Sequence, residues 1–247
     1  MKDLYATVKI NEEIAQNIYS LTVTLDEEVE GVTGGKFLNI STGGARLLRR
    51  PLGVMKKEGK DITVCYQLKG EGTVALSQMK KGERVSVLLP LGNGFDLGNA
   101  KTVAVIGGGV GVFPLIATLR RHAKNVDFYT YFGFRNKQAV CLLNEAKPYS
   151  KKLTVVTDDG SFGEKGNAVE AFFKDNIKPD LIISCGPPIM FKALKKKLDE
   201  KGDKTKCLVS LEERMGCGIG ACLVCTCKKT DGAMARVCAD GPVFDIN

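Results

Sequence analysis

The sequence predicts a multidomain protein of mixed β and α/β class, with an antiparallel barrel, a parallel-sheet domain and a small cysteine-rich end. Three observations predict this class. The first 98 residues hold short, evenly spaced strand-like runs, and from about Lys101 apolar runs alternate with helical stretches. Five of the nine cysteines fall between Cys217 and Cys238. We therefore expect domains at residues 1–98, 99–211 and 212–247.

Composition and length indicate a folded protein without membrane association. The chain has 247 residues, of which 44% are hydrophobic and 26% charged, which excludes a disordered or collagen-like chain. No apolar run approaches the roughly 20 residues needed to cross a bilayer, and residues 1–12 lack the apolar core of a signal peptide. A cytoplasmic chain keeps its cysteines reduced, so the cysteine cluster indicates metal binding rather than disulfides. We expect a cytoplasmic location.

The formal net charge of +8 raises the possibility of a nucleic-acid partner. The densest group of positive residues is Lys192, Lys195, Lys196 and Lys197, and it lies within 190–198, where apolar residues recur at helical spacing. These lysines are therefore expected to form the solvated face of a helix. Bound anionic cofactors would also lower the net charge, and no nucleic-acid partner is expected.

The first domain is expected to be a small antiparallel barrel. Its predicted strands are separated by Gly, Asn, Lys and Glu turns, and they are Tyr5–Ile10, Ile18–Leu25, Phe37–Ile40, Ile62–Leu68 and Arg84–Leu89. Short strands at regular spacing are typical of such barrels. The segment Pro90–Gly94 interrupts regular structure and marks the expected boundary.

The second domain is expected to contain a parallel sheet of about five strands with covering helices. Its predicted strands are largely apolar, and they are Val103–Ile106, Val126–Phe132, Leu153–Thr157, Leu181–Cys185 and Cys207–Leu211. The third region has few long apolar side chains, so it requires a metal centre to hold it.

The sharpest motif is formed by four cysteines of the third region. Cys217, Cys222 and Cys225 have the spacing C-x4-C-x2-C, and Cys238 follows after twelve further residues. This is the plant-type ferredoxin spacing for a [2Fe–2S] cluster. A zinc site is the alternative, but zinc sites usually pair two short cysteine knuckles and only one occurs here. Cys227 is interpreted as a buried bystander.

The glycines among these cysteines support the iron–sulfur interpretation. Gly216, Gly218 and Gly220 allow the backbone to wrap closely around a cluster. Backbone N–H groups can then point at the sulfurs and stabilise the negative charge of the cluster. Such a cluster carries one electron at a time, so another group has to exchange electrons with it.

A glycine loop follows the first strand of the α/β domain. Gly107, Gly109 and Gly111 precede Pro114 in the pattern G-x-G-x-G-x-x-P, and a helix is expected to begin there. The N-terminus of such a helix can receive a pyrophosphate. The alternative is a merely tight turn between a strand and a helix.

Two further strand ends support a nicotinamide nucleotide at this sheet. Cys185, Gly186 and Pro187 end one predicted strand, where Cys185 either packs in the core or lies beside a nicotinamide ring. Asp158 ends the preceding strand and can accept from ribose hydroxyls, which favours NAD over NADP, whereas Arg135 favours the phosphorylated form.

Three segments of the barrel are suitable for a flavin dinucleotide. They offer a positive charge for a pyrophosphate, an aromatic ring, a hydroxyl and close backbone approach. The segments consist of Arg50, Pro51, Leu52 and Gly53, of Cys65, Tyr66 and Gln67, and of Gly72 and Thr73. Alone they are equally typical of ordinary turns. A flavin would connect a nicotinamide, which exchanges electrons in pairs, to a cluster that exchanges them singly.

Over nearly its whole length the sequence resembles the electron-transfer subunits of NAD-dependent dihydroorotate dehydrogenase B, within the ferredoxin-reductase-like superfamily. The matching motifs are Arg50–Pro51, Tyr66, Gly72–Thr73, Pro90–Phe95, Gly107–Pro114, Thr157–Gly163, Cys185–Met190, Ser210–Cys222 and Cys238–Phe244. The resemblance implies FAD on the three barrel segments and a [2Fe–2S] cluster on the four cysteines. It also implies a separate FMN-containing catalytic chain, assembled as a heterotetramer, which oxidises dihydroorotate while electrons pass through the cluster and FAD to NAD⁺.

Two positions depart from the family pattern. The family usually has Ser or Thr where this chain has Gly53, and an arginine is frequent where it has Gln67. A backbone N–H at Gly53 could replace the missing hydroxyl. These departures leave the predicted fold unaffected, but they bear on which protein is the partner.

Two other functions remain to be weighed. The same cofactor relay could serve another flavoprotein, as in ferredoxin:NADP reductase or sulfide dehydrogenase, although the retained Cys217 favours the dihydroorotate family. A zinc- or iron-sensing regulator would leave the glycine loop without a purpose. His122 is the single histidine and is expected on the surface, so proton abstraction is left to a partner.

Overall fold

The computed structural model describes residues 1–43, 47–229 and 232–246. Its chain forms two compact units, one of residues 1–94 with 212–242 and one of residues 95–211 with 243–247. The cysteine-rich region thus packs with the barrel, and the last residues join the parallel sheet. The predicted three-domain boundaries stay predictions. Among the described residues no helix has the length and apolar character to cross a membrane.

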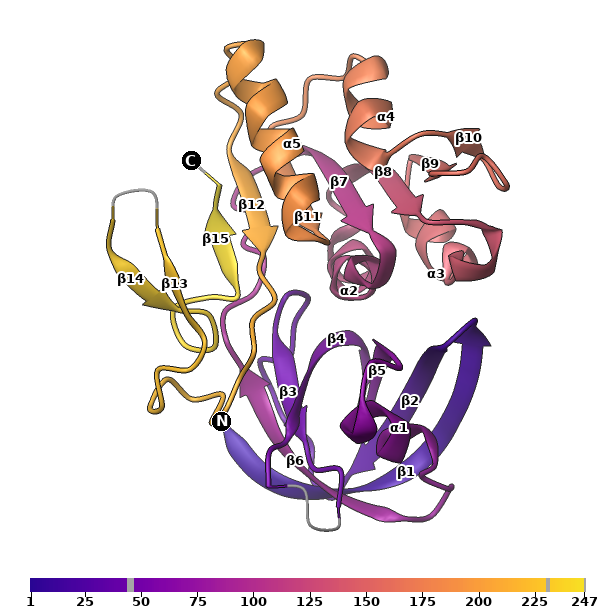
Figure 1. The fold of residues 1–247 in the computed structure, drawn as a ribbon, viewed down its shortest axis with the longest axis vertical. Helices are drawn as coiled ribbons and strands as arrows, with labels where there is room; N and C mark the ends of the chain where they lie inside the picture. Colours follow the sequence, from indigo (N-terminus) through magenta and orange to yellow (C-terminus); the bar gives the residue numbers. More distant parts are fainter. Residues whose placement is uncertain (44–46, 230–231, 247) are drawn as a thin grey trace. The chain divides into compact units, whose positions relative to one another are not determined.

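The first unit contains the expected antiparallel barrel (Figure 1), closed in the strand order β1-β2-β5-β4-β3-β6. Its elements are β1 (Lys2–Ala15), β2 (Ile18–Leu25), β3 (Phe37–Ile40), β4 (Arg50–Glu58), β5 (Asp61–Gln67), helix α1 (Glu71–Ser77) and β6 (Arg84–Leu91). Strand β4 was missed in the sequence because Pro51, Gly53 and a lysine pair interrupt its alternation. Pairing with β3 and β5 holds it in the barrel.

The second unit contains a seven-stranded sheet in the order β10-β9-β8-β7-β11-β12-β15. The strands are β7 (Thr102–Gly108), β8 (Asp127–Phe134), β9 (Lys152–Thr157), β10 (Glu164–Lys165), β11 (Leu181–Cys185), β12 (Cys207–Ser210) and β15 (Val243–Asp245). The five predicted parallel strands are confirmed. Strand β10 adds a short parallel edge, and β15 adds an antiparallel edge at the other side. Both additions are too short to leave a periodic signal.

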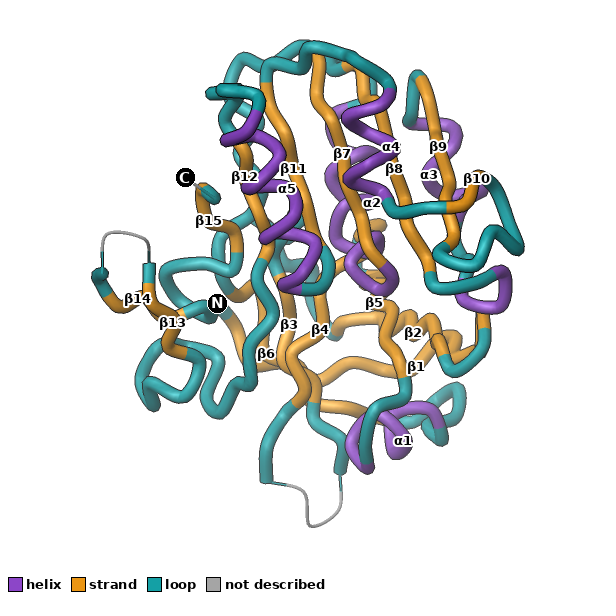
Figure 2. The backbone as a smooth tube through the Cα atoms, turned by 45° about the horizontal axis from the view of Figure 1, so that its top comes forward, coloured by secondary structure: helices purple, strands orange, loops and turns teal. Residues whose placement is uncertain are grey.

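Helices cover both faces of this sheet (Figure 2). Helices α2 (Val112–His122) and α3 (Leu143–Ala146) lie on one face, and α4 (Ala168–Lys174) and α5 (Pro188–Glu200) lie on the other. Three short 3-10 turns complete the unit, at Gly109–Gly111, Lys137–Ala139 and Lys147–Tyr149. Along α5, Leu194 and Leu198 are buried. Of the four lysines expected on the solvated face, Lys192 and Lys196 are exposed, whereas Lys195 and Lys197 are half-buried.

The order of the strands locates a binding edge. From β7 the chain moves outward through β8 and β9 and then returns to the other side of β7 with β11 and β12. In open α/β sheets ligands bind where the strand order reverses, outside the carboxyl ends of the two central strands. Here those ends are the glycine loop after β7 and the Cys185 turn after β11.

Candidate cofactor-binding sites

All four predicted cluster sulfurs accept hydrogen bonds from backbone N–H groups. The N–H of Cys222 donates to Sγ of Cys217, and the N–H of Cys217 donates to Sγ of Cys222, both at 3.4 Å. The N–H of Cys238 donates to Sγ of Cys225 at 3.4 Å, and the N–H of Gly220 donates to Sγ of Cys238 at 3.1 Å. Such donors favour sulfur ligands that carry negative charge.

Two glycines make this cradle possible. Gly218 and Gly220 have φ values of +74° and +84°, a region that side chains rarely adopt. A Cβ at Gly218 would lie 2.1 Å from Nδ2 of Asn39, and one at Gly220 would lie 2.8 Å from Cβ of Ala239. The loop can therefore approach the barrel and the second cysteine segment closely only with glycine at these positions.

The thiols respond in opposite ways to their surroundings. Burial opposes the ionisation of Cys217, but the N–H groups of Ile219 and Cys222 outweigh it and lower its pKa to about 6. Burial, together with the neighbouring Cys225 sulfur, raises the pKa of Cys238 to about 12. A positively charged centre would therefore favour the thiolate of Cys238, which its own surroundings oppose.

The donor set fits a two-iron cluster better than a single zinc ion. Backbone-to-sulfur hydrogen bonds join the four cysteines as two pairs, Cys217 with Cys222 and Cys225 with Cys238. A structural zinc ion needs four ligands converging on one point, whereas a [2Fe–2S] cluster divides its ligands between two irons.

Cys227, expected to be buried, is in fact only half-buried. It lies on strand β13 (Thr226–Lys228), which pairs with β14 (Met234–Arg236).

Sequence reasoning missed the polar residues that support the cysteine segments. Asn39, on β3, is 1% exposed, and its side-chain amide donates to the carbonyl of Cys217 at 3.4 Å. Its Oδ1 has no partner among the described residues. A polar residue inside the apolar run Phe37–Ile40 was the signal that could have identified it. Arg236 and Asp240 form a second support, around Gly220.

In the barrel, the structure brings Arg50 of β4 against the first turn of α1. The guanidinium of Arg50 donates from Nη1 to the carbonyl of Leu48 at 2.6 Å. A Cβ at Gly72 would lie 2.1 Å from Nε of Arg50, so this side chain crosses the space that the glycine leaves. The hydroxyl of Thr73 accepts from the N–H groups of Lys69 and Gly70, at 2.9 and 3.2 Å, and so closes the turn. The half-buried guanidinium fits the pyrophosphate of a dinucleotide.

Other members of the predicted flavin set lie in the barrel wall. Tyr66 is 3% exposed, stacks on Tyr19 with ring centroids 5.8 Å apart, and donates to Oδ1 of Asn11 at 3.2 Å. Burial raises the pKa of its hydroxyl. Leu52 and Cys65 are buried as well, whereas Pro51, Gly53 and Gln67 are half-buried. The flavin roles of all these residues stay predictions.

In the second unit, the glycine loop packs directly against the turn after β11. A Cβ at Gly111 would lie 2.3 Å from the carbonyl oxygen of Cys185, and one at Gly108 would lie 2.9 Å from Cδ of Pro187. A Cβ at Gly186 would lie 3.1 Å from the N atom of Gly108. These approaches place the predicted nucleotide residues together at the point where the strand order reverses.

Three other residues lie around this edge or away from it. Asp158 and Arg135 are exposed just after β9 and β8, and the N–H of Asp158 donates to the carbonyl of Phe134 at 3.0 Å. His122, expected on the surface, is half-buried, and burial lowers its pKa. It ends α2, which an 11-residue length places about 15 Å from the glycine loop.

Comparison with known protein families matches two parts of the chain. Residues 212–247 match the iron-sulfur cluster binding domain of dihydroorotate dehydrogenase B, and residues 105–196 match an oxidoreductase NAD-binding domain. Among solved structures, a chain of NADH-dependent reduced ferredoxin-NADP oxidoreductase has a TM-score of 0.86 at 26% identity, over 98% of this chain and 88% of that one. The cytochrome b5 reductase domain of Ulva prolifera nitrate reductase shares the fold, with a TM-score of 0.70 at 16% identity, over 83% of this chain and 97% of that one.

Relatives match nearly the whole chain. The dihydroorotate dehydrogenase B (NAD(+)) electron transfer subunit of Bacillus pumilus is 39% identical over 99% of this chain and 96% of its own length. The corresponding protein of Streptococcus mutans is 37% identical over 97% and 95%. These similarities confirm the predicted fold and the predicted cofactors, FAD, a [2Fe–2S] cluster and NAD. The chain therefore belongs to the family of electron transfer subunits of NAD⁺-dependent dihydroorotate dehydrogenase B.

Proposed function

We propose that this chain carries electrons from a catalytic subunit that oxidises dihydroorotate to NAD⁺, as a step of pyrimidine biosynthesis. We further propose that the catalytic subunit contains FMN and that the two chains assemble as a heterotetramer in the cytoplasm. The observation that supports this best is the set of N–H donors around four cysteine sulfurs, in the same compact unit as the flavin barrel. A cluster and a flavin held in one compact unit are suited to passing electrons from one to the other.

Within this proposal each group of residues has one task. Cys217, Cys222, Cys225 and Cys238 hold the cluster, and Arg50 with the first turn of α1 holds the pyrophosphate of FAD. The loop Gly107–Gly111 holds NAD, while Cys185 lies beside its nicotinamide. When bound, the cluster supplies single electrons, NAD takes a hydride, and FAD exchanges electrons in both ways. The single histidine, His122, is far from the glycine loop, so proton abstraction from dihydroorotate falls to the partner.

The partner is proposed to dock around Cys222, which is exposed. Three apolar side chains flank it: Ile219, Leu223 and Val224 are 48%, 62% and 58% exposed. Adjacent exposed apolar residues are typical of protein interaction sites. A partner on this surface would exclude water from the cluster and would approach the sulfur ligands directly.

A second candidate partner is a larger flavoprotein of the ferredoxin-NADP oxidoreductase kind. It is favoured by the similarity to a chain of that enzyme over 98% of this chain and by Gly53, where the dihydroorotate family usually has a hydroxyl. The 39% identity to the dihydroorotate relatives against 26% to that chain favours the first proposal.

Mass spectrometry of the chain that co-purifies anaerobically with this one separates the two candidates. A dihydroorotate dehydrogenase chain supports the proposal, and a larger nucleotide-binding flavoprotein contradicts it. Substitution Cys222→Ser tests the relay. We expect the variant to retain FAD and to accept electrons from NADH while it transfers none to the partner; unchanged transfer would exclude the cluster from the path.

A further inference from the structure

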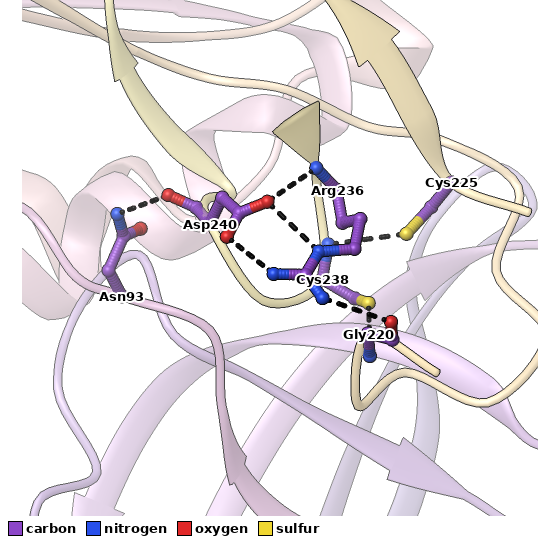
Figure 3. Close-up of polar contacts among 6 residues, drawn as sticks. All are labelled: Asn93, Gly220, Cys225, Arg236, Cys238 and Asp240. Atoms are coloured by element: carbon purple, nitrogen blue, oxygen red, sulfur yellow. Dashed lines mark hydrogen bonds and ion pairs between the residues drawn. The ribbon is translucent and has the colours of Figure 1, made fainter. Parts of the chain in front are cut away.

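Arg236 and Asp240 form a compact ion pair between the cysteine-bearing segments (Figure 3). The carboxylate of Asp240 accepts from three nitrogens of Arg236, namely the backbone N at 2.8 Å, Nε at 3.1 Å and Nη2 at 3.0 Å. The remaining nitrogen, Nη1, donates to the carbonyl of Gly220 at 3.2 Å. The guanidinium therefore joins the first cysteine loop, residues 216–222, to the second cysteine loop, residues 236–241.

The residues that this pair holds also contact the ligand sulfurs. Gly220, whose carbonyl binds Arg236, donates its N–H to Sγ of Cys238. Cys238, between the two members of the pair, donates its N–H to Sγ of Cys225. The carbonyl of Asp240 accepts from the side chain of Asn93 at 3.2 Å, which anchors the second cysteine loop beyond the end of β6.

We propose that Arg236 and Asp240 are a positioning pair that keeps the two cysteine loops in register for the cluster and sets the charge beside it. The inference rests on the proposed ligand set. Neither residue belongs to the proposed ligand set: the Arg236 guanidinium binds the Asp240 carboxylate and the Gly220 carbonyl. Arg236 alone would stabilise the extra electron of a reduced cluster, and Asp240 counteracts that effect.

The test uses the full chain in its anaerobically purified complex. The variants are Arg236→Gln, Asp240→Asn and Arg236→Lys, with Asp26→Asn as the matched control. Asp26 pairs with Arg84 on the barrel at 2.6 Å with half-exposed side chains, as in the Arg236–Asp240 pair, but this ion pair involves no residue of the cysteine loops. The measurements are the rate at which a chelator removes iron, the reduction potential of the cluster, and FAD content.

We expect Arg236→Gln and Asp240→Asn each to speed iron loss about tenfold, as is typical when partners of metal ligands are removed. The potential should fall in Arg236→Gln and rise in Asp240→Asn, whereas Arg236→Lys should lose iron faster with little change in potential. FAD content should stay constant throughout. Opposite shifts would not follow from loosening alone.

Wild-type rates and potentials in both variants would overturn the inference, as would equal effects from Asp26→Asn. Shifts of the same sign in both charge variants would refute the electrostatic part. A wild-type complex that contains no two-iron cluster would instead overturn the ligand assignment itself, so the two failures are distinguishable.

Discussion

Substitution Gly72→Ala should weaken FAD binding without weakening the barrel. The new Cβ would lie 2.1 Å from Nε and 2.5 Å from Cζ of Arg50, distances that a folded protein does not tolerate. The clashing atoms are at the far end of a flexible side chain, so the guanidinium can swing away while the backbone of α1 stays in place. The cost should therefore appear at the ligand rather than in folding.

The magnitude follows from the bond that would be displaced. A hydrogen bond to a charged group contributes about 1.5–3 kcal/mol, which corresponds to roughly 10- to 150-fold in affinity. The free energy of unfolding of the flavin-free protein should change by about 1 kcal/mol or less, because only the Arg50 side chain has to move and alanine is favoured over glycine inside a helix by about 0.5–1 kcal/mol. A large loss of affinity with little loss of stability is the expected signature.

The assay is titration of flavin-stripped protein with FAD by fluorescence, together with urea denaturation. Gly70→Ala is the control, because its Cβ would meet nothing within 4 Å and its backbone is extended. Arg50→Gln should weaken FAD as much as Gly72→Ala, and the double variant should add little, since both remove one interaction. Wild-type affinity in Gly72→Ala, or full additivity, would refute the reasoning.

Three other predictions concern the scaffold. Gly111→Ala pushes against the backbone of Cys185, so we expect about 1–3 kcal/mol of destabilisation with weakened NADH binding; a wild-type melting temperature would contradict this. Asn11→Leu removes the side chain that forms hydrogen bonds with the carbonyls of Leu76 and Met79 and with the Tyr66 hydroxyl. We expect the free energy of unfolding in urea to fall by about 1–3 kcal/mol, and an unchanged unfolding midpoint would refute this prediction. The hydrogen bond from Lys152 lowers the pKa of Asp175 in the folded protein below its unfolded value of 3.8. The ionised carboxylate should therefore contribute its full stabilisation of the fold above pH 3.8, and this contribution should disappear as the pH falls through the lower pKa of the folded state. Asp175→Asn should remove that acid dependence, and an identical pH profile would exclude this residue as its source.

The features predicted correctly are those that leave a local pattern. The spacing of Cys217, Cys222 and Cys225 specifies the cluster motif within nine residues, and the runs of β7 and β11 are apolar because both faces of their sheet are covered. The glycine loop after β7 is also local, because a strand, a turn and a helix start follow one another along the chain.

The features that were missed depend on residues far apart in the chain. Asn39 and Cys217 are separated by 178 positions, so no periodicity links them, and only the closed barrel brings β3 beside the cysteine loop. The sequence of strand β4 does not predict a strand, because Pro51 and Gly53 interrupt the alternation of apolar and polar residues, yet β3 and β5 both pair with it. Tertiary context overrode local preference in that strand.

By itself, the sequence determined the cofactor chemistry of this protein, since ligand spacing, glycine loops and strand rhythm are encoded over short stretches. Only the tertiary structure decided which groups support that chemistry. In the structure, Tyr66 is buried in the barrel core and the Arg50 side chain lies against Gly72. The two cysteine loops are joined through Arg236 and Asp240. The physical reason is that close packing selects contacts by shape and hydrogen bonding in three dimensions, which spacing along a chain does not record.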